Sequence, residues 1–121
     1  MNIEDAPILD DAVLDELRES TGGDEDFVRE LVEAYVAEAT GYLDAMTHAI
    51  AGGDTAAIVR PAHTLKSSSA TLGAMRLAGI SRGIEEAGRA GHAEGMAAAV
   101  ERAHSTWTET IDALRAAGLA T

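Results

Sequence analysis

The sequence has no cysteine, a single lysine and only four aromatic side chains. Without cysteine, a disulfide, a thiolate nucleophile and a cysteine-ligated metal site are all excluded. The hydrophobic content of 46% therefore comes mostly from alanine, leucine, valine and isoleucine, a composition that favours closely packed helices over sheets. The chain also has no apolar run of about 18 residues and no basic start followed by an apolar run, so we expect a cytoplasmic protein without a membrane segment.

Acidic residues are unevenly placed along the 121 residues, which we expect to form one domain, 1–121. Residues 1–52 contain fourteen acidic side chains and two arginines, whereas residues 53–121 contain seven of each sign. Within the second part, residues 53–91 carry five basic and three acidic side chains, so this stretch is the best suited to hold an anion. The overall net charge of −12 disfavours nucleic-acid binding.

Apolar residues recur at three-four spacing in five stretches, each of which predicts a helix. The stretches are residues 10–20, a long segment from Phe27 to Ile50, the segment from Asp54 to Gly73, residues 77–88 and residues 96–114. Gly22-Gly23-Asp24 and Gly52-Gly53-Asp54 are expected to end one helix and to provide an aspartate N-cap for the next. Pro61 predicts either a kink near residue 57 or a helix whose regular part begins close to Pro61.

No strand pattern interrupts these helices, and short connections place neighbouring helices antiparallel. The predicted fold class is therefore all-α, an antiparallel up-and-down four-helix bundle with a short N-terminal capping helix.

His63 is predicted to face outward from the third helix. At about 100° per residue, the apolar stripe formed by Ile58, Ala62, Leu65, Ser69 and Leu72 lies on the opposite side of the helix. Lys66, the only lysine, follows one turn later, close enough for its ammonium to reach an anion attached to the imidazole. Imidazole is largely neutral and nucleophilic near pH 7, and the small residues beyond Lys66 leave room for the backbone of another protein.

The stretch from His63 to Ala74, HTLKSSSATLGA, resembles the signature of the histidine-containing phosphotransfer (HPt) family, in which the phosphorylated histidine is followed by x-Leu-Lys-Gly-Ser and later by Gly-Ala. Leu77, Ile84-Glu85, Ala87 and Arg89, together with the segment from Phe27 to Tyr35, extend the resemblance to about residues 8–116. Ser67 stands where the family usually has glycine, and we expect slightly altered partner docking with function retained.

The resemblance implies a carrier that moves a phosphoryl group between aspartates of response-regulator receiver domains. His63 would accept and donate the group, Lys66 would stabilise its oxygens, and Glu85, where some relatives have glutamine, would lie near the imidazole with water or Lys66 between it and the phosphoryl group. The implied docking patch comprises Val59, Ala62, Ser67 and Ala70, with Arg76 at its edge.

The expected partners are receiver domains and a hybrid sensor histidine kinase, and the expected state is a monomer. Mg²⁺ would be supplied by the receiver, so we expect no metal or cofactor of its own and phosphorylation on the exposed Nε2. No G-x-x-x-x-G-K-[ST] nucleotide cradle is present, so we expect a carrier and not an enzyme. Two alternatives stay open: a receiver-binding module without phosphotransfer, and the phospho-accepting domain of a larger histidine kinase, although Met1 and the capping helix favour a free-standing chain.

Two other motifs have weaker support. The stretch from Gly22 to Phe27 resembles the diguanylate cyclase signature with one residue inserted, but that signature needs a β-hairpin and this stretch joins two predicted helices. Glu101 and His104 have the spacing of a di-iron bundle, but no second such pair is present. We expect His48, His92 and His104 to be surface or boundary residues.

Overall fold

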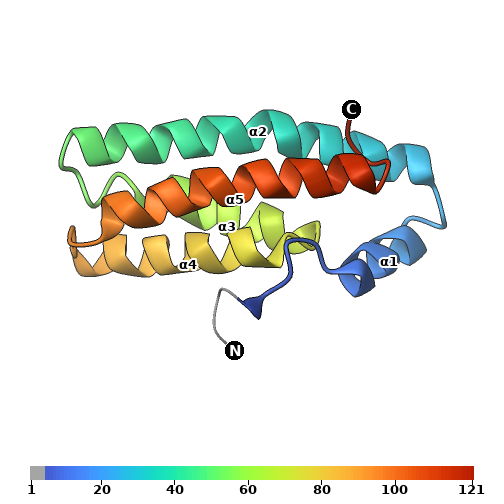
Figure 1. Cartoon of the computed structure of the whole chain (residues 1–121), viewed down its shortest axis with the longest axis horizontal. Coiled ribbons are helices and arrows are strands. Elements are labelled where there is room, and N and C mark those ends of the chain that lie inside the picture. The colour runs from blue at the N-terminus through green and yellow to red at the C-terminus, as the bar shows by residue number, and fades with distance from the viewer. Residues whose placement is uncertain (1–4) are drawn as a thin grey trace.

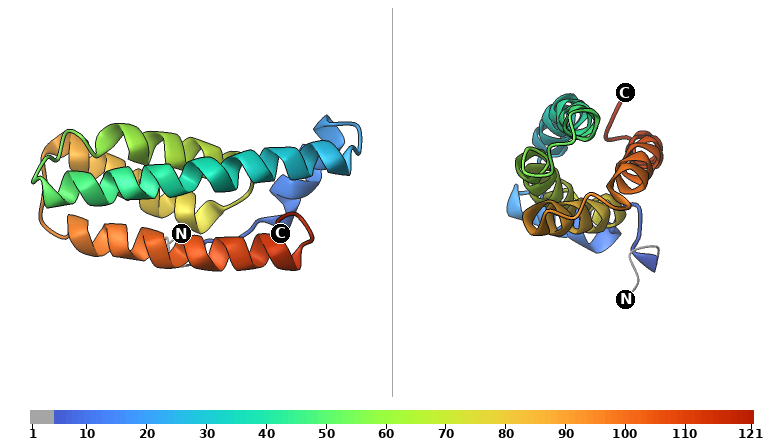
Figure 2. Two further views of the ribbon diagram at one scale, coloured as in Figure 1. Left: turned by 90° about the horizontal axis from the view of Figure 1, so that it is seen from above. Right: turned by 90° about the vertical axis from the view of Figure 1, so that its left-hand side faces the viewer.

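The computed structural model describes residues 5–121, which contain five α-helices and no strand. The helices are α1 (Asp11–Ser20), α2 (Glu25–Ala51), α3 (Val59–Thr71), α4 (Met75–Ala90) and α5 (Met96–Ala116). Helices α2 to α5 run alternately in opposite directions around a common core, and α1 lies at one end beside the start of α2 (Figures 1 and 2). The predicted up-and-down bundle with a short N-terminal helix is confirmed. In residues 5–121 no helix is long and apolar enough to cross a membrane.

The core is built from small and branched side chains, with one aromatic pair between α2 and α5. The rings of Tyr35 and Trp107 meet edge to face, with centroids 5.2 Å apart. The hydroxyl of Tyr35 is also 2.7 Å from that of Ser69, which ties α2 to the buried side of α3. Phe27 was expected on the apolar stripe of α2, but it is 45% exposed, because it lies in the first turn of the helix while its neighbour Val28 points into the core.

The aspartates of the two glycine-aspartate turns cap different structures. Asp24 caps α2 as predicted, with its carboxylate accepting a hydrogen bond from the backbone N–H of Phe27 at 3.0 Å. Asp54 instead accepts from the N–H of Ala57 and caps a turn, and α3 begins only at Val59. Pro61 then lies in the first helical turn, where its missing N–H costs no hydrogen bond. Of the two predicted alternatives, the helix that begins near Pro61 is correct.

Helices α3 and α4 are joined by a short connection and pack closely. A β-carbon on Gly88 would lie 2.7 Å from Cγ2 of Ile58 and 2.9 Å from Cγ2 of Val59, so only glycine allows this approach. At the other end of the pair, Gly73 has a φ of 80°, and its carbonyl accepts a hydrogen bond from the N–H of Asp10 at 2.8 Å. These two glycines therefore set the distance between α3 and α4 and anchor the start of α1.

Candidate functional site

The imidazole of His63 is exposed on α3, on the side away from the core. Its side chain is 53% exposed, whereas the predicted stripe on the other side of the helix is buried. The outward position predicted from helical spacing is confirmed. The ring forms a hydrogen bond with a side chain of α4, the next helix along the chain.

Glu85 of α4 is the centre of the site, with a side chain only 6% exposed. One carboxylate oxygen accepts from Nζ of Lys66 at 2.6 Å, and the other lies 2.7 Å from Nδ1 of His63. Arg89, one turn further along α4, donates to this second oxygen from Nη2 at 2.9 Å and from Nε at 3.3 Å. A single nearly buried carboxylate thus connects three basic side chains from two helices.

The electrostatics of this cluster keep Glu85 ionised. Hydrogen bonds from Lys66 and then from Arg89 lower the pKa of Glu85 to about 2; burial opposes this shift, and the hydrogen bond with His63 adds to it. An ionised carboxylate can only accept hydrogen bonds, so Nδ1 of His63 must carry the proton that lies between them. In the neutral imidazole, Nε2 is then left with its lone pair free and directed away from Glu85. Of the two ring nitrogens, Nε2 is therefore the one that could act as a nucleophile.

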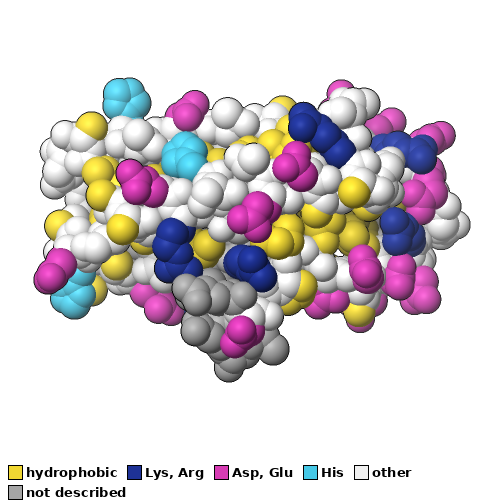
Figure 3. All heavy atoms as spheres, viewed as in Figure 1, with side chains coloured by type: hydrophobic (Ala, Val, Ile, Leu, Met, Phe, Trp, Pro, Cys, Tyr) yellow, Lys and Arg dark blue, Asp and Glu magenta, His cyan; other side chains and the backbone are white. Residues whose placement is uncertain are grey.

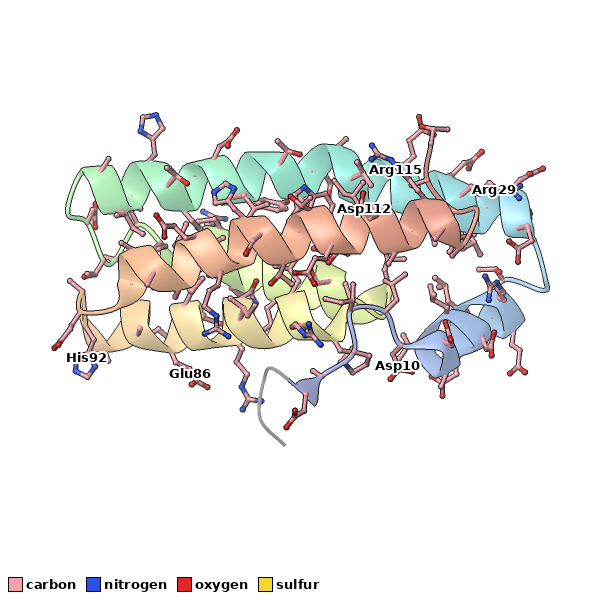
Figure 4. All side chains as sticks on the ribbon, viewed as in Figure 1. Asp10, Arg29, Glu86, His92, Asp112 and Arg115 are labelled. Carbon is pink, nitrogen blue, oxygen red and sulfur yellow. The ribbon has the colours of Figure 1, made fainter. Side chains whose placement is uncertain are left out.

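A shallow hollow of about 650 Å³ opens beside Lys66, between α3 and α4. Helix α3 contributes Lys66, Ser67 and Ala70. Helix α4 contributes, besides Glu85, residues that recur at three-four spacing: Met75, Ala78, Gly79, Arg82, Glu86 and Arg89. Glu86 marks this side of α4 in Figure 4, where it points away from α5. Small residues line much of the hollow, and its charged side chains are three cations and two carboxylates, a net positive charge that suits an approaching anionic group.

The expected docking residues divide into those that reach this surface and those that do not. Ser67 is exposed, and Val59 and Ala70 are half-buried on the same side as His63. Ala62 is fully buried, so its expected place in the docking patch is wrong; it belongs to the core stripe.

Arg76 is not at the edge of the hollow. It lies nine residues before Glu85, which is half a turn around α4 at about 100° per residue. Its Nε donates to the carbonyl of Ala6 at 2.9 Å and its backbone N–H to that of Pro7 at 3.0 Å. Arg76 therefore holds the N-terminal segment against the start of α4.

Sequence reasoning did not identify Arg82 and Arg89 as site residues. Arg89 touches Glu85 directly, and Arg82 lies on the rim of the hollow, where it pairs with Glu86 at 3.2 Å. The signal was present in the sequence, because both arginines fall three or four residues from Glu85 and so share its side of α4.

The other histidines lie apart from this site. His48 and His92 are exposed, and His104 is half-buried with its Nε2 2.9 Å from the hydroxyl of Thr47. In the view of Figure 3, with α5 toward the reader, the histidine side chains are separated from one another. His92 lies at the end of the bundle opposite α1 (Figure 4). Within residues 5–121 no group of three or more histidine, aspartate or glutamate side chains is placed to hold a metal ion.

Comparisons with known proteins point to one family. The family model of the Hpt domain matches residues 30–117. The crystal structure of histidine-containing phosphotransfer protein B from Pseudomonas aeruginosa PAO1 is similar to this chain with a TM-score of 0.80 and 31% sequence identity, over 87% of this chain and 89% of that one. A search of curated proteins found no match.

Proposed function

This chain belongs to the Hpt domain family of phosphorelay carriers, and we propose that His63 is the residue on which it carries the phosphoryl group. The observation that carries this proposal is the hydrogen bond between Nδ1 of His63 and the ionised carboxylate of Glu85. In this hydrogen bond Nδ1–H is the donor, which fixes the ring proton on Nδ1 and leaves the other nitrogen, Nε2, free to attack phosphorus.

In the proposed reaction, Nε2 attacks the phosphorus of an aspartyl phosphate on a receiver domain. The new nitrogen–phosphorus bond forms as the bond between phosphorus and the aspartate oxygen breaks, and the carboxylate leaves with the electron pair. The proton on Nδ1 stays in its hydrogen bond with Glu85 throughout. The reverse step delivers the group to another receiver, and Mg²⁺ is supplied by that partner.

Lys66 and Arg89 are proposed to balance the charge that arrives with the phosphoryl group. A phosphoryl group brings between one and two negative charges close to Glu85, which by itself would repel it. Lys66 and Arg89 both contact Glu85 already, at 2.6 Å and 2.9 Å. Both side chains are long enough to bind phosphoryl oxygens while staying near the carboxylate.

Incubation with a phosphorylated receiver tests this assignment. We expect an acid-labile, alkali-stable phosphoprotein whose label is lost in His63→Gln. His92→Gln is the matched control, because it removes an exposed histidine that lies beyond the C-terminal end of α4 and does not line the hollow, so this variant should keep the label. Label that persists in His63→Gln would overturn the assignment of the site.

Several further properties belong to the same proposal. We propose that the chain acts without a nucleotide site of its own, as a monomer that exchanges phosphoryl groups with receiver domains and is supplied through a hybrid sensor kinase. Its cytoplasmic location stays a prediction. Native mass spectrometry would test the monomer, and incubation with radiolabelled ATP alone, which should give no label, would test the absence of self-phosphorylation.

A further inference from the structure

Hydroxyl side chains are frequent on α3, and Ser67 differs from the others. Thr64, Ser68 and Thr71 each donate to the carbonyl four residues earlier, at 3.1, 2.9 and 3.0 Å. Ser69 is buried and shares a hydrogen bond with a tyrosine of α2. Across residues 5–121, no partner is present for the hydroxyl of Ser67, which is exposed to solvent. Of these five hydroxyls, Ser67 alone is available for an external group.

The position of Ser67 brings this hydroxyl close to His63. Residues four apart on a helix have β-carbons about 5–6 Å apart, and side chains lean toward the N-terminus of their helix. The hydroxyl of Ser67 therefore lies over the turn that carries His63. It also lines the hollow together with Lys66 and Arg82.

A phosphoryl group on His63 would face this hydroxyl. Because Glu85 holds Nδ1, the group stands on Nε2, at the outer side of the ring. Its terminal oxygens then reach the turn of α3 that follows His63. This turn carries one cation, Lys66 at i+3, and one neutral donor, Ser67 at i+4. The neutral donor adds a hydrogen bond without a further charge.

We propose that the hydroxyl of Ser67 donates a hydrogen bond to a terminal oxygen of the phosphoryl group carried on His63. The inference rests on the proposed function, since it requires His63 to be the phosphorylated residue. The charged groups that line the hollow are Lys66 on α3 and Arg82, Glu85, Glu86 and Arg89 on α4. A donor that favours the dianion over the monoanion lowers the second pKa of the phosphoryl group.

The test uses the whole chain phosphorylated with potassium phosphoramidate, so that no cognate receiver is needed. Nε2 bonds to phosphorus as the phosphorus–nitrogen bond of the donor, which is protonated on nitrogen, breaks and ammonia leaves with the electron pair. A pH titration followed by ³¹P NMR then gives the second pKa of the phosphoryl group in each variant. In Ser67→Ala we expect this pKa to rise by about half a unit, roughly a threefold change in proton affinity and the size expected for losing one exposed hydrogen bond.

Two further variants separate a direct contact from a change in the helix. Ser67→Thr keeps a hydroxyl at the same position and should keep the wild-type pKa. Ser68→Ala removes the neighbouring hydroxyl, which is bonded to the helix backbone, and should also leave the pKa unchanged.

The outcomes distinguish the two proposals. If the label is on His63 but Ser67→Ala titrates like the wild type, the hydrogen bond is refuted and the carrier function stands. An equal rise in Ser67→Ala and Ser68→Ala would also refute it, since the effect would then be general to the helix. A wild-type protein that takes no label at His63 would overturn the proposed function and this inference together.

Discussion

Replacing Glu85 with glutamine changes one nearly buried carboxylate into an amide of almost the same shape. The perturbation removes the charge that Lys66, Arg89 and His63 all contact, and it leaves the packing of α4 in place. Because the lost charge is shielded from solvent, its effect on stability should be large and should depend strongly on pH.

The magnitude follows from the pKa of Glu85, which falls from an ordinary value of 4.5 to about 2 in the folded protein. One pKa unit corresponds to about 1.4 kcal/mol, so ionised Glu85 contributes about 3 kcal/mol to the free energy of unfolding. The folded-state pKa is the lower of the two, so this contribution is complete above pH 4.5 and is lost as the pH falls toward 2. We therefore expect Glu85→Gln to be about 2–3 kcal/mol less stable at pH 7, a difference that narrows to under about 1 kcal/mol near pH 2.5.

Urea unfolding at pH 7, 5.5, 4, 3 and 2.5, followed by circular dichroism, measures the difference directly. Glu86→Gln is the matched control, because Glu86 is the next residue on α4 and its side chain is 66% exposed, in a surface pair with Arg82. Such pairs contribute about 0–1 kcal/mol, so this variant should stay close to the wild type at every pH. A stability difference between wild type and Glu85→Gln that is constant from pH 7 to pH 2.5 would refute the reasoning.

Three further substitutions test the packing that positions the site. Gly88→Ala places a β-carbon 2.7 Å from Ile58, so we expect a loss of about 1–3 kcal/mol in thermal or urea unfolding, together with slower phosphorylation of His63. Tyr35→Phe leaves the buried hydroxyl of Ser69 without its 2.7 Å partner and should cost about 1–2 kcal/mol by the same measurement, with an unchanged stability contradicting the hydrogen bond. Ser81→Ala removes a buried hydroxyl that has no partner among residues 5–121, so its midpoint of unfolding should rise or stay the same, and a clear loss would show that the hydroxyl is bonded.

Helical spacing predicted the fold and the outward position of His63, because both depend on the angle of each residue around its own helix. The same reasoning failed for Phe27, since the first turn of α2 extends past the core that its neighbour Val28 enters. The docking patch implied by the family resemblance had Arg76 at its edge, although the angle of Arg76 around α4 puts it half a turn from Glu85.

The contacts between helices depend on how far one helix is shifted along the other. The sequence indicates that α3 and α4 are antiparallel neighbours, but not that His63 lies opposite Glu85. That alignment is set by the connection through Gly73 and by the close approach at Gly88. The resemblance to the HPt family placed Glu85 near the imidazole, whereas its contact with Arg89 came only from the structure.

The short connection between α3 and α4 makes the site a local structure. His63 and Glu85 are 22 residues apart, and Lys66 and Arg89 lie within the same helical hairpin. Contacts at short sequence separation form with a small loss of chain entropy, so the hairpin can assemble early in folding. The turn that joins α4 to α5 lies outside this hairpin, so its length can change without altering the spacing between the imidazole and its carboxylate. A carrier of this design can therefore vary at the turn between α4 and α5 while the geometry of its site is kept.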